Sequence, residues 1–311
     1  MSKPLIFIDG EAGTTGLGIR DRLRAFAAVE LRGLPDAHRK DPAARRDAMA
    51  DSDLVILCLP DAAARESAAL ADGLGNQAPK LLDASTAHRV HPEWTYGFPE
   101  LSPGQAGRIA DASKVANPGC YPTGALALIR PLVDAGLLPP DYPVSINAIS
   151  GYSGGGRSLI EAHDRDAGPA FELYALGLEH KHIPETEAYS GLTRRPIFVP
   201  SVGHFRQGML VSIPLHLDTL PGKPKAADLQ AVLEARYAGT DTIRVVSPAA
   251  SGKLEPEALN GTNRMELSVY TNETHRQAVL VARLDNLGKG ASGAAVQNLC
   301  LMLGLKEPTH A

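Results

Sequence analysis

The sequence has few cysteines, a small net charge and no long apolar runs. Three cysteines occur in 311 residues, an odd number without paired spacing. This argues against a disulfide framework and against a zinc site, so we expect no metal. The formal net charge of −4 provides no basic surface of the kind that binds nucleic acid. Because no apolar run is long enough to span a bilayer, we expect no membrane segment.

Other absences bear on location and organisation. A strand is predicted to start at Leu5, so we expect no signal peptide and a cytoplasmic protein. The chain shows no internal repeat and no low-complexity segment. Its 311 residues, 44% of them apolar, are enough for one large or two medium domains with a sizeable core.

The N-terminal segment carries a nucleotide-binding pattern. A short buried strand at 5–8 is followed by glycines spaced G-x-x-G-x-x-G and then by a helical pattern. Such a loop allows the backbone to approach a diphosphate, whose charge then lies at the helix N-terminus. Since the spacing is a variant of the usual motif, an ordinary strand-to-helix turn is the alternative interpretation. The candidate cofactor contacts in this loop are Gly10, Gly13, Thr14, Thr15 and Gly16.

Further strands are predicted along the first half of the chain. Strands that alternate with helices indicate an open parallel sheet, whose ligands bind beyond the carboxyl ends of the strands. Pro60 and Ser85 lie at such ends and are candidate cofactor contacts. The predicted strands are 29–31, 53–59, 80–83 and 114–116.

The residues after the second predicted strand bear on the choice of cofactor. No acidic residue stands directly after it to bind a ribose diol, whereas Arg32, Arg39 and Lys40 lie nearby. This pattern favours the 2′-phosphate of NADP over NAD, and Arg32 is the candidate contact. The alternative is that these cations are solvated surface residues.

Cys120 lies between a Pro-Gly turn and a helix predicted at 123–133. A helix N-terminus stabilises a thiolate and lowers the pKa of the thiol, which makes Cys120 the candidate nucleophile. The alternative is a small buried hydrophobe, the usual state of a free cysteine. Cys58 and Cys300 lie in apolar segments and fit that description.

The second half of the chain supplies candidate anion contacts. A strand predicted at 144–149 ends in a loop at 150–157, rich in glycine and serine, that would cradle an anion. A flexible loop is the alternative interpretation. Arg206 precedes a strand predicted at 210–217, a position from which it would bind phosphate or carboxylate. The candidate substrate contacts in these segments are Ser150, Ser153, Gly154, Arg157 and Arg206.

Two histidines and a carboxylate lie within six residues, at 180–185. A thiol nucleophile needs a base, and we predict His182 for that role. Glu185, three residues later, would orient the His182 ring if the segment turns helically. His180 is the alternative base and otherwise a candidate substrate contact. Alternate histidines also occur in metal sites, but the sequence shows no further ligand cluster.

The C-terminal segment 285–298 precedes an apolar helix that is expected to end near Gly304. Small residues at its start allow close packing or close approach of the backbone to a ligand, and Asn286 is a candidate cofactor contact. We expect the segment to return to the nucleotide-binding domain, because the strands of the second domain are complete by then. The predicted domains are 1–119 plus 285–311 for the cofactor and 120–284 for catalysis and oligomer contacts.

Together these motifs resemble the short form of the N-acetyl-gamma-glutamyl-phosphate reductases. The resemblance covers nearly the whole chain and is strongest at 117–124, which is similar to the family's active-site signature. It implies an aspartate-semialdehyde-dehydrogenase-like architecture, in which a Rossmann-type parallel-sheet α/β domain binds NADP. An α+β domain would then serve catalysis and oligomer contacts, in a homodimer or homotetramer. The other segments that carry the resemblance are 10–16, 96–101, 150–157, 180–185 and 285–298.

The resemblance also implies a reaction of arginine biosynthesis. N-acetyl-L-glutamyl 5-phosphate, a small acyl phosphate, is reduced with NADPH to N-acetyl-L-glutamate 5-semialdehyde, and phosphate is released. Cys120 would form a thioester, His182 would move the proton, and backbone N–H groups after Cys120 would stabilise the oxyanion.

Two other hypotheses stand beside this one. The first is another acyl-phosphate or semialdehyde dehydrogenase, such as aspartate-semialdehyde dehydrogenase, which would share the chemistry and differ in substrate. The match of residues 180–185 to the reductase motif favours the N-acetylglutamyl substrate over that rival. The second is a non-catalytic NADP-binding redox sensor, with Cys120 as the sensing thiol.

Overall fold

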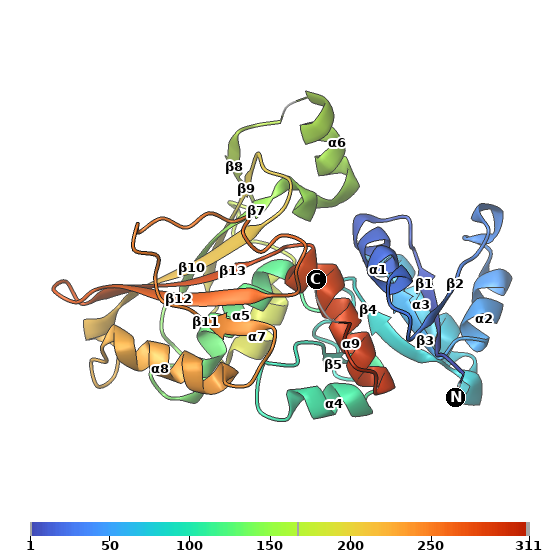
Figure 1. Ribbon diagram of the computed structural model, residues 1–311, viewed down its shortest axis with the longest axis horizontal. Coiled ribbons are helices and arrows are strands. Elements are labelled where there is room, and N and C mark those ends of the chain that lie inside the picture. The colour runs from blue at the N-terminus through green and yellow to red at the C-terminus, as the bar shows by residue number, and fades with distance from the viewer. Residues whose placement is uncertain (1, 167, 309–311) are drawn as a thin grey trace. The chain divides into compact units, whose positions relative to one another are not determined.

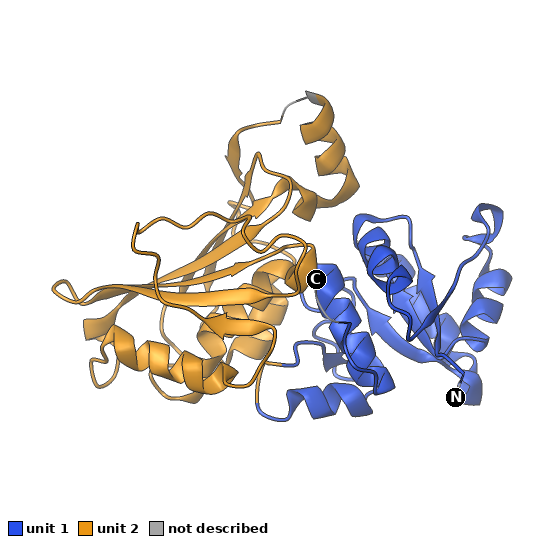
Figure 2. Ribbon diagram, viewed as in Figure 1, with its two compact units in different colours: residues 1–99, 103–118, 291–311 blue, residues 100–102, 119–290 orange. Residues whose placement is uncertain are grey.

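The computed structural model describes residues 2–166 and 168–308, and these form two compact units (Figures 1 and 2). The first unit contains the described residues up to Pro99, together with Pro103–Pro118 and the described residues from Ala291 onward. The second unit contains Glu100–Ser102 and Gly119–Gly290. Apart from the short segment Glu100–Ser102, the chain changes unit next to Cys120 and again at Ala291, whereas the predicted second change lies at Asp285.

The first unit is built on a parallel sheet, which in the described chain has six strands in the order β2-β1-β3-β4-β6-β5. All the strands predicted for this part of the sequence are confirmed, with ends that differ by one or two residues. β5 was not predicted, because a two-residue strand has no pattern to detect. The strands are β1 (Leu5–Asp9), β2 (Glu30–Arg32), β3 (Leu54–Leu57), β4 (Lys80–Asp83), β5 (Thr95–Tyr96) and β6 (Lys114–Ala116).

Helices bury both faces of this sheet, which explains why its strands are apolar without alternation. Ile6 and Ile56 pack on one side with residues of α1 and α9. Phe7 and Val55 pack on the other side with residues of α2 and α3. The helices are α1 (Thr14–Arg24), α2 (Pro42–Ala50), α3 (Asp61–Asp72), α4 (Gln105–Asp111) and α9 (Gly293–Leu303), with short 3₁₀ turns at Asp36–His38 and Gly75–Gln77.

The second unit contains a mixed sheet of seven described strands in the order β11-β12-β13-β10-β7-β9-β8. The pairs β7–β9 and β11–β12 are parallel and the other pairs are antiparallel. The strands predicted at 144–149 and 210–217 are confirmed as β7 and β10. The strands are β7 (Ser145–Gly151), β8 (Phe171–Leu173), β9 (Ile197–Gly203), β10 (Met209–His216), β11 (Ile243–Val245), β12 (Met265–Asn272) and β13 (Gln277–Leu284).

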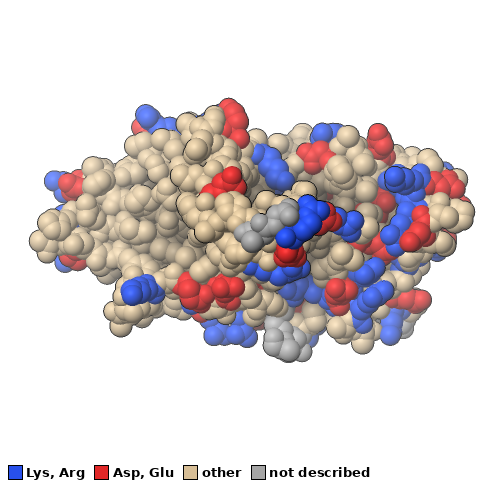
Figure 3. Space-filling view, turned by 90° about the horizontal axis from the view of Figure 1, so that it is seen from above, with Lys and Arg blue, Asp and Glu red and all other residues tan. Residues whose placement is uncertain are grey.

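Helices α5 and α8 cover one face of this sheet, and α7 packs against α5 (Figure 1). The other face carries a shallow apolar hollow lined by Leu210, Tyr270, Val279 and Val281 among others. Figure 3 shows a broad area of the second unit with few charged side chains. The helices are α5 (Cys120–Asp134), α6 (Gly156–Asp166), α7 (Ile183–Ser190) and α8 (Ala226–Tyr237), with shorter helical turns at Tyr152–Gly155, Leu217–Thr219 and Gly288–Ser292.

The predicted fold class is confirmed: a Rossmann-type parallel sheet in one unit and a mixed α+β arrangement in the other. Within the described ranges, no helix combines the length and the apolar character needed to cross a membrane.

Candidate active site

Cys120 occupies the first turn of α5, at the helix N-terminus where the sequence predicts it. The helix begins at Cys120 rather than at the predicted Thr123, because Pro122 fits a first helical turn, where its missing N–H breaks no hydrogen bond. Gly119 is the N-cap in an extended conformation, and its carbonyl accepts a hydrogen bond from Thr123 Oγ1 at 2.8 Å. The thiol therefore lies at the positive end of the helix dipole.

A buried carboxylate anchors the residue before the nucleophile. Oε2 of Glu185 accepts a hydrogen bond from the backbone N–H of Gly119 at 3.0 Å, and Glu185 is 1% exposed. A hydrogen bond to a charged acceptor is stronger than one between neutral groups, so this contact fixes the start of α5. The sequence did not predict it. The expected pairing of Glu185 with the His182 ring stays a prediction.

The histidine segment enters α7 as the sequence predicts. His182 is the N-cap, Pro184 lies in the first turn, and Glu185 follows within the same turn. The backbone N–H of His182 donates to Nδ1 of His180 at 3.1 Å, and the two ring centroids are 4.7 Å apart. Since Nδ1 of His180 accepts this hydrogen bond, a neutral His180 carries its proton on Nε2. His182 is buried, with 6% exposed.

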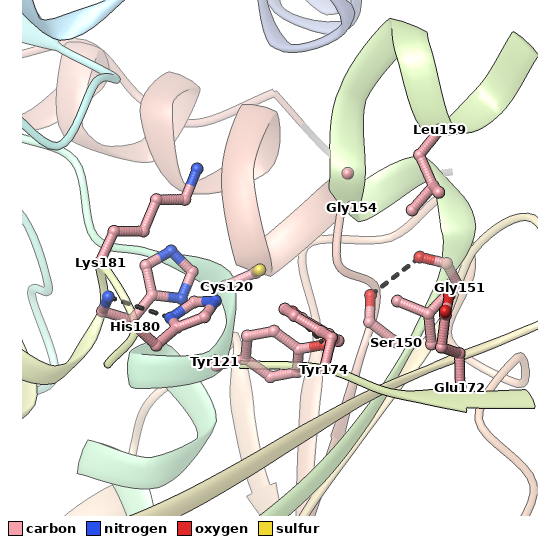
Figure 4. Close-up of a pocket in the computed structure, with 13 residues that line it drawn as sticks. Cys120, Tyr121, Ser150, Gly151, Gly154, Leu159, Glu172, Tyr174, His180 and Lys181 are labelled. Carbon is pink, nitrogen blue, oxygen red and sulfur yellow. Dashed lines mark hydrogen bonds between the residues drawn. The ribbon is translucent and has the colours of Figure 1, made fainter. Parts of the chain in front are cut away.

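The nucleophile and both histidines line one cavity of about 350 Å³ that lies entirely within the second unit (Figure 4). A pocket of this size accommodates a small metabolite. In Figure 4 the Cys120 sulfur points toward the space that the labelled residues surround. The lining residues are Cys120, Tyr121, Ser150, Gly151, Gly154, Gly155, Leu159, Glu172, Tyr174, His180, Lys181, His182 and Val202.

Two tyrosines line the cavity and are held neutral. The Tyr121 hydroxyl donates to the Ser201 carbonyl at 3.0 Å, and the Tyr174 hydroxyl donates to the Tyr121 hydroxyl at 3.2 Å. Burial raises the pKa of Tyr174 to about 12. Burial, followed by the neighbouring Tyr174, also raises the pKa of Tyr121. Neither phenol ionises near neutral pH, so among the groups around Cys120 the two histidines are better candidates for a base.

The predicted anion loop divides between the cavity and the protein interior. Ser150 and Gly154 line the cavity, whereas Ser153 is buried behind it. Asn286 donates through Nδ2 to Ser153 Oγ at 3.0 Å and accepts through Oδ1 from Gly208 N–H at 2.8 Å. Asn286 therefore braces this loop inside the second unit, and its predicted contact with the cofactor stays a prediction.

The two predicted anion-binding arginines lie outside the residues that line the cavity. Arg157 is exposed in the first turn of α6. Arg206 lies in the connection between β9 and β10, where its side chain is 59% exposed and Nη1 is 3.4 Å from Asp164 Oδ2. The Arg206 carbonyl accepts the Ser153 N–H at 3.0 Å, which fixes the backbone there and leaves the side chain at the surface. A substrate contact for either arginine stays a prediction.

Comparison with known proteins identifies the family of this chain. The chain is 55% identical over 311 residues to the N-acetyl-gamma-glutamyl-phosphate reductase of Brucella ovis, covering 97% of this chain and 99% of that protein. The chain belongs to the N-acetyl-gamma-glutamyl-phosphate reductase family. It is also 52% identical over 310 residues to N-acetyl-gamma-glutamyl-phosphate reductase 2 of Pseudomonas putida, covering 98% of both chains. The family resemblance inferred from the motifs is thereby confirmed.

A family model and a solved structure also match this chain. Residues 120–286 match the family model described as semialdehyde dehydrogenase, dimerisation domain. A crystal structure of aspartate semialdehyde dehydrogenase with NADP from Candida albicans aligns with a TM-score of 0.67 and 14% identity, covering 97% of this chain and 99% of that one. At that identity the likeness supports the fold.

In this member of the reductase family, the glycine loop of the first unit has no room for a side chain at its first and last glycines, Gly10 and Gly16. Gly10 has a φ of 90°, and a Cβ there would lie 2.5 Å from the Cys58 carbonyl oxygen. A Cβ on Gly16 would lie 2.8 Å from the Gly10 carbonyl oxygen. Gly13 is the N-cap of α1. The turn is therefore as tight as a diphosphate-binding loop requires, and these residues fit a dinucleotide.

A cluster of arginines lies beside this loop. Arg20 and Arg24 from α1, together with Arg32 and Arg39, line a second hollow that also includes Glu11. The sequence analysis missed Arg20 and Arg24, although a spacing of four places both on one face of a helix. Arg32 pairs with Asp51 Oδ2 at 2.7 Å, and Arg39 pairs with Glu11 Oε1 at 2.9 Å.

Pro60 and Ser85 lie beyond the carboxyl ends of β3 and β4, as expected. Pro60 is the N-cap of α3. Ser85 donates from Oγ to Asp83 Oδ2 at 2.8 Å, and His88 Nδ1 is 2.6 Å from the same oxygen. The sequence analysis did not single out His88, because nothing in its immediate neighbourhood reports a partner five residues earlier.

A buried amide network in the first unit holds the segment that leads to Cys120. The Asn117 carbonyl accepts from Arg89 Nε at 3.0 Å, and Asn117 Nδ2 donates to the Ala291 carbonyl at 3.1 Å. Asn298 Nδ2 donates to Asn117 Oδ1 at 3.0 Å. None of these partners was predicted, because the residues are far apart in sequence.

Proposed function

We propose that the chain reduces N-acetyl-L-glutamyl 5-phosphate to N-acetyl-L-glutamate 5-semialdehyde with NADPH and releases phosphate, a step of amino-acid biosynthesis. The observation that carries the proposal is Cys120 at the N-terminus of α5, in one cavity with His180 and His182. It is supported by the 52–55% identity to proteins named for this reaction. The aspartate-semialdehyde alternative is supported less well, since the neighbour of that name shares 14% identity. A cytoplasmic location is consistent with this biosynthetic role.

The chemistry follows from the residues in the cavity. The Cys120 thiolate attacks the acyl carbon, the bond from that carbon to the phosphate oxygen breaks, and phosphate leaves with the electron pair. Bound NADPH supplies a hydride for reduction of the resulting thioester. His182, which takes the proton of the Cys120 thiol when the thiolate forms, then donates it to the developing oxyanion and takes it back as the carbon–sulfur bond breaks, releasing aldehyde and thiolate. The N-terminus of α5 provides the electrostatic environment that favours both the thiolate and the oxyanion.

We further propose that the first unit binds the cofactor and the second carries out catalysis and oligomer contacts. The glycine loop, Pro60 and Ser85 of the first unit would hold the dinucleotide. For the 2′-phosphate, the arginines beside the loop supply the charge that NADP requires and NAD does not. The aspartate semialdehyde dehydrogenase from Candida albicans, of similar fold, was crystallised with NADP.

Neutralising two of these arginines is expected to weaken NADP use. We predict that Arg32→Gln/Arg39→Gln raises KM for NADP by at least about tenfold, because charge-assisted bonds to phosphate contribute about 1.5–3 kcal/mol each. KM for NAD should change little, since NAD carries no 2′-phosphate. Initial rates against both cofactors measure this. A wild-type enzyme that used NAD and NADP with equal kcat/KM would refute the preference.

We propose that the chain forms a homo-oligomer through the open face of the second sheet. The hollow on that face is lined mainly by apolar side chains, and Val279 on β13 is 37% exposed. Val279→Asp should dissociate the assembly, because an unpaired charge buried at an interface costs several kcal/mol. Molar mass by light scattering tests this. The matched control is Val90→Asp, at a valine of the first unit that is 49% exposed, which should leave the mass unchanged. A wild-type monomer at micromolar concentration would contradict the proposal.

The proposed reaction is tested in the reverse direction, with NADP, phosphate and either N-acetylglutamate semialdehyde or aspartate semialdehyde. The proposal expects turnover of the acetylated substrate that requires phosphate or arsenate, with kcat/KM at least about 100-fold above that for aspartate semialdehyde. Preference for aspartate semialdehyde would support the rival dehydrogenase. No turnover with either, together with reversible oxidation of Cys120, would support the redox sensor.

A further inference from the structure

A fully buried lysine in the second unit has no role in the proposed chemistry. Lys289 is 0% exposed, and its Nζ lies 2.8 Å from Glu100 Oε1. The Thr242 hydroxyl donates to the same carboxylate oxygen and accepts from Lys289 Nζ at 3.5 Å. Three segments far apart in sequence therefore meet at one buried ion pair.

Stability alone is a weak reason to bury this pair. Removing two charges from water costs several kcal/mol per ion, and well-packed apolar residues of similar volume often give equal or greater stability. A buried pair does define one arrangement of the segments that carry it, since each charge must meet its partner. The role of this pair therefore depends on the segment that Lys289 holds in place.

Lys289 belongs to the helical turn Gly288–Ser292, and the next residue touches the nucleophile. A Cβ built on Gly290 would lie 2.8 Å from Cys120 Cβ, so the Gly290 backbone is packed against that side chain. The Gly290 N–H donates to the Asp285 carbonyl at 2.9 Å, which closes the turn on one side. Lys289, bound to Glu100, holds the other side of the same turn.

We infer that Lys289, held by Glu100 and Thr242, is a positioning residue for Cys120. It fixes the Gly290 backbone against the Cys120 side chain and so keeps the sulfur directed into the cavity (Figure 4). The inference rests on the proposed function for the role of Cys120 as nucleophile. The position of the thiol can nevertheless be measured without substrate.

The first test is Lys289→Met, which keeps the length of the side chain and removes the charge. It is expected to lower kcat about 10- to 100-fold, because displacing a reacting group by near 1 Å costs on that order, with KM within about threefold. The rate at which iodoacetamide alkylates Cys120, followed by peptide mass spectrometry, should fall with kcat. The matched control is Lys114→Met, which removes a lysine ion pair of the same 2.8 Å length at the surface. It should change neither quantity.

Lys289→Met also removes the positive charge that faces the buried Glu100, so a second variant separates positioning from folding. Glu100→Gln/Lys289→Met removes both charges and should regain most of the lost melting temperature. A merely structural pair would regain the wild-type kcat and alkylation rate as well. The inference expects both rates to stay low, and their recovery in this double variant overturns it.

Thr242→Val provides a milder variant that keeps the ion pair. It removes one hydrogen bond to Glu100 with little change in side-chain volume. Both kcat and the rate of Cys120 alkylation should then fall about threefold. Wild-type rates in this variant would overturn the inference even if the charged variants do not fold. If alkylation follows this pattern while the wild type turns over no acylated semialdehyde, the proposed function fails and the positioning stands.

Discussion

Cys120→Ser is expected to reduce turnover by at least about 10³-fold, because loss of an essential nucleophile costs several orders of magnitude. The serine hydroxyl keeps the size of the side chain and its place at the start of α5. A hydroxyl ionises far less readily than a thiol, however, so the helix N-terminus has no anion to stabilise. NADP affinity should remain within about twofold, since the predicted cofactor contacts lie elsewhere. Steady-state rates and isothermal titration with NADP measure the two effects.

Cys300→Ala is the matched control for that substitution. Cys300 is 1% exposed in α9, and burial raises the pKa of its thiol to about 12. It therefore supplies no thiolate near neutral pH, and its loss should leave kcat unchanged. A Cys120→Ser enzyme that retained more than about a tenth of the wild-type rate would defeat the assignment of the nucleophile.

Local features of the fold and site were predictable because they depend on neighbouring residues. The glycine spacing predicted the loop between β1 and α1, where Gly10 has a positive φ, and the apolar run at 53–59 predicted the strand β3. Pro122 and the Pro-Gly turn before it placed Cys120 at a helix start. Each of these signals lies within a few residues of the structure that it predicts.

The contacts that support the site were not predictable, since they join residues far apart in the chain. Glu185 binds Gly119 across 66 positions, and Lys289 binds Glu100 across 189. Periodicity and turn chemistry report on neighbours and carry no signal for such pairs. Arg20 and Arg24 are different: their helical spacing was visible, but the hollow that they share with Arg39 was not.

The role of Glu185 also depends on a contact with a residue far away in the sequence. From sequence, a carboxylate three residues after His182 is most simply an orienter of that histidine. In the folded chain Glu185 accepts the N–H of Gly119, the residue before the nucleophile. Through Glu185, the start of α7 is tied to the start of α5, so the base candidate and the thiol are held by one side chain.

His182→Asn is expected to lower kcat by about 10²–10⁴-fold, the usual contribution of a positioned acid–base group. His182 is buried in the cavity that holds Cys120, and asparagine cannot take and return a proton. The melting temperature should stay close to that of the wild type, since the backbone groups of His182 that bond to His180 and Thr186 remain. Rates with N-acetylglutamate semialdehyde and a thermal melt provide the measurements.

His180→Asn is the matched variant that decides between the two histidines. The amide oxygen of the introduced asparagine can take the place of His180 Nδ1 and accept the His182 N–H, so the local backbone is preserved. If His180 contacts substrate, this variant should raise KM and lower kcat by less than about tenfold, because it removes a binding contact and leaves the base in place. A dead His180→Asn enzyme beside a normally active His182→Asn enzyme would reverse the assignment and make His180 the base.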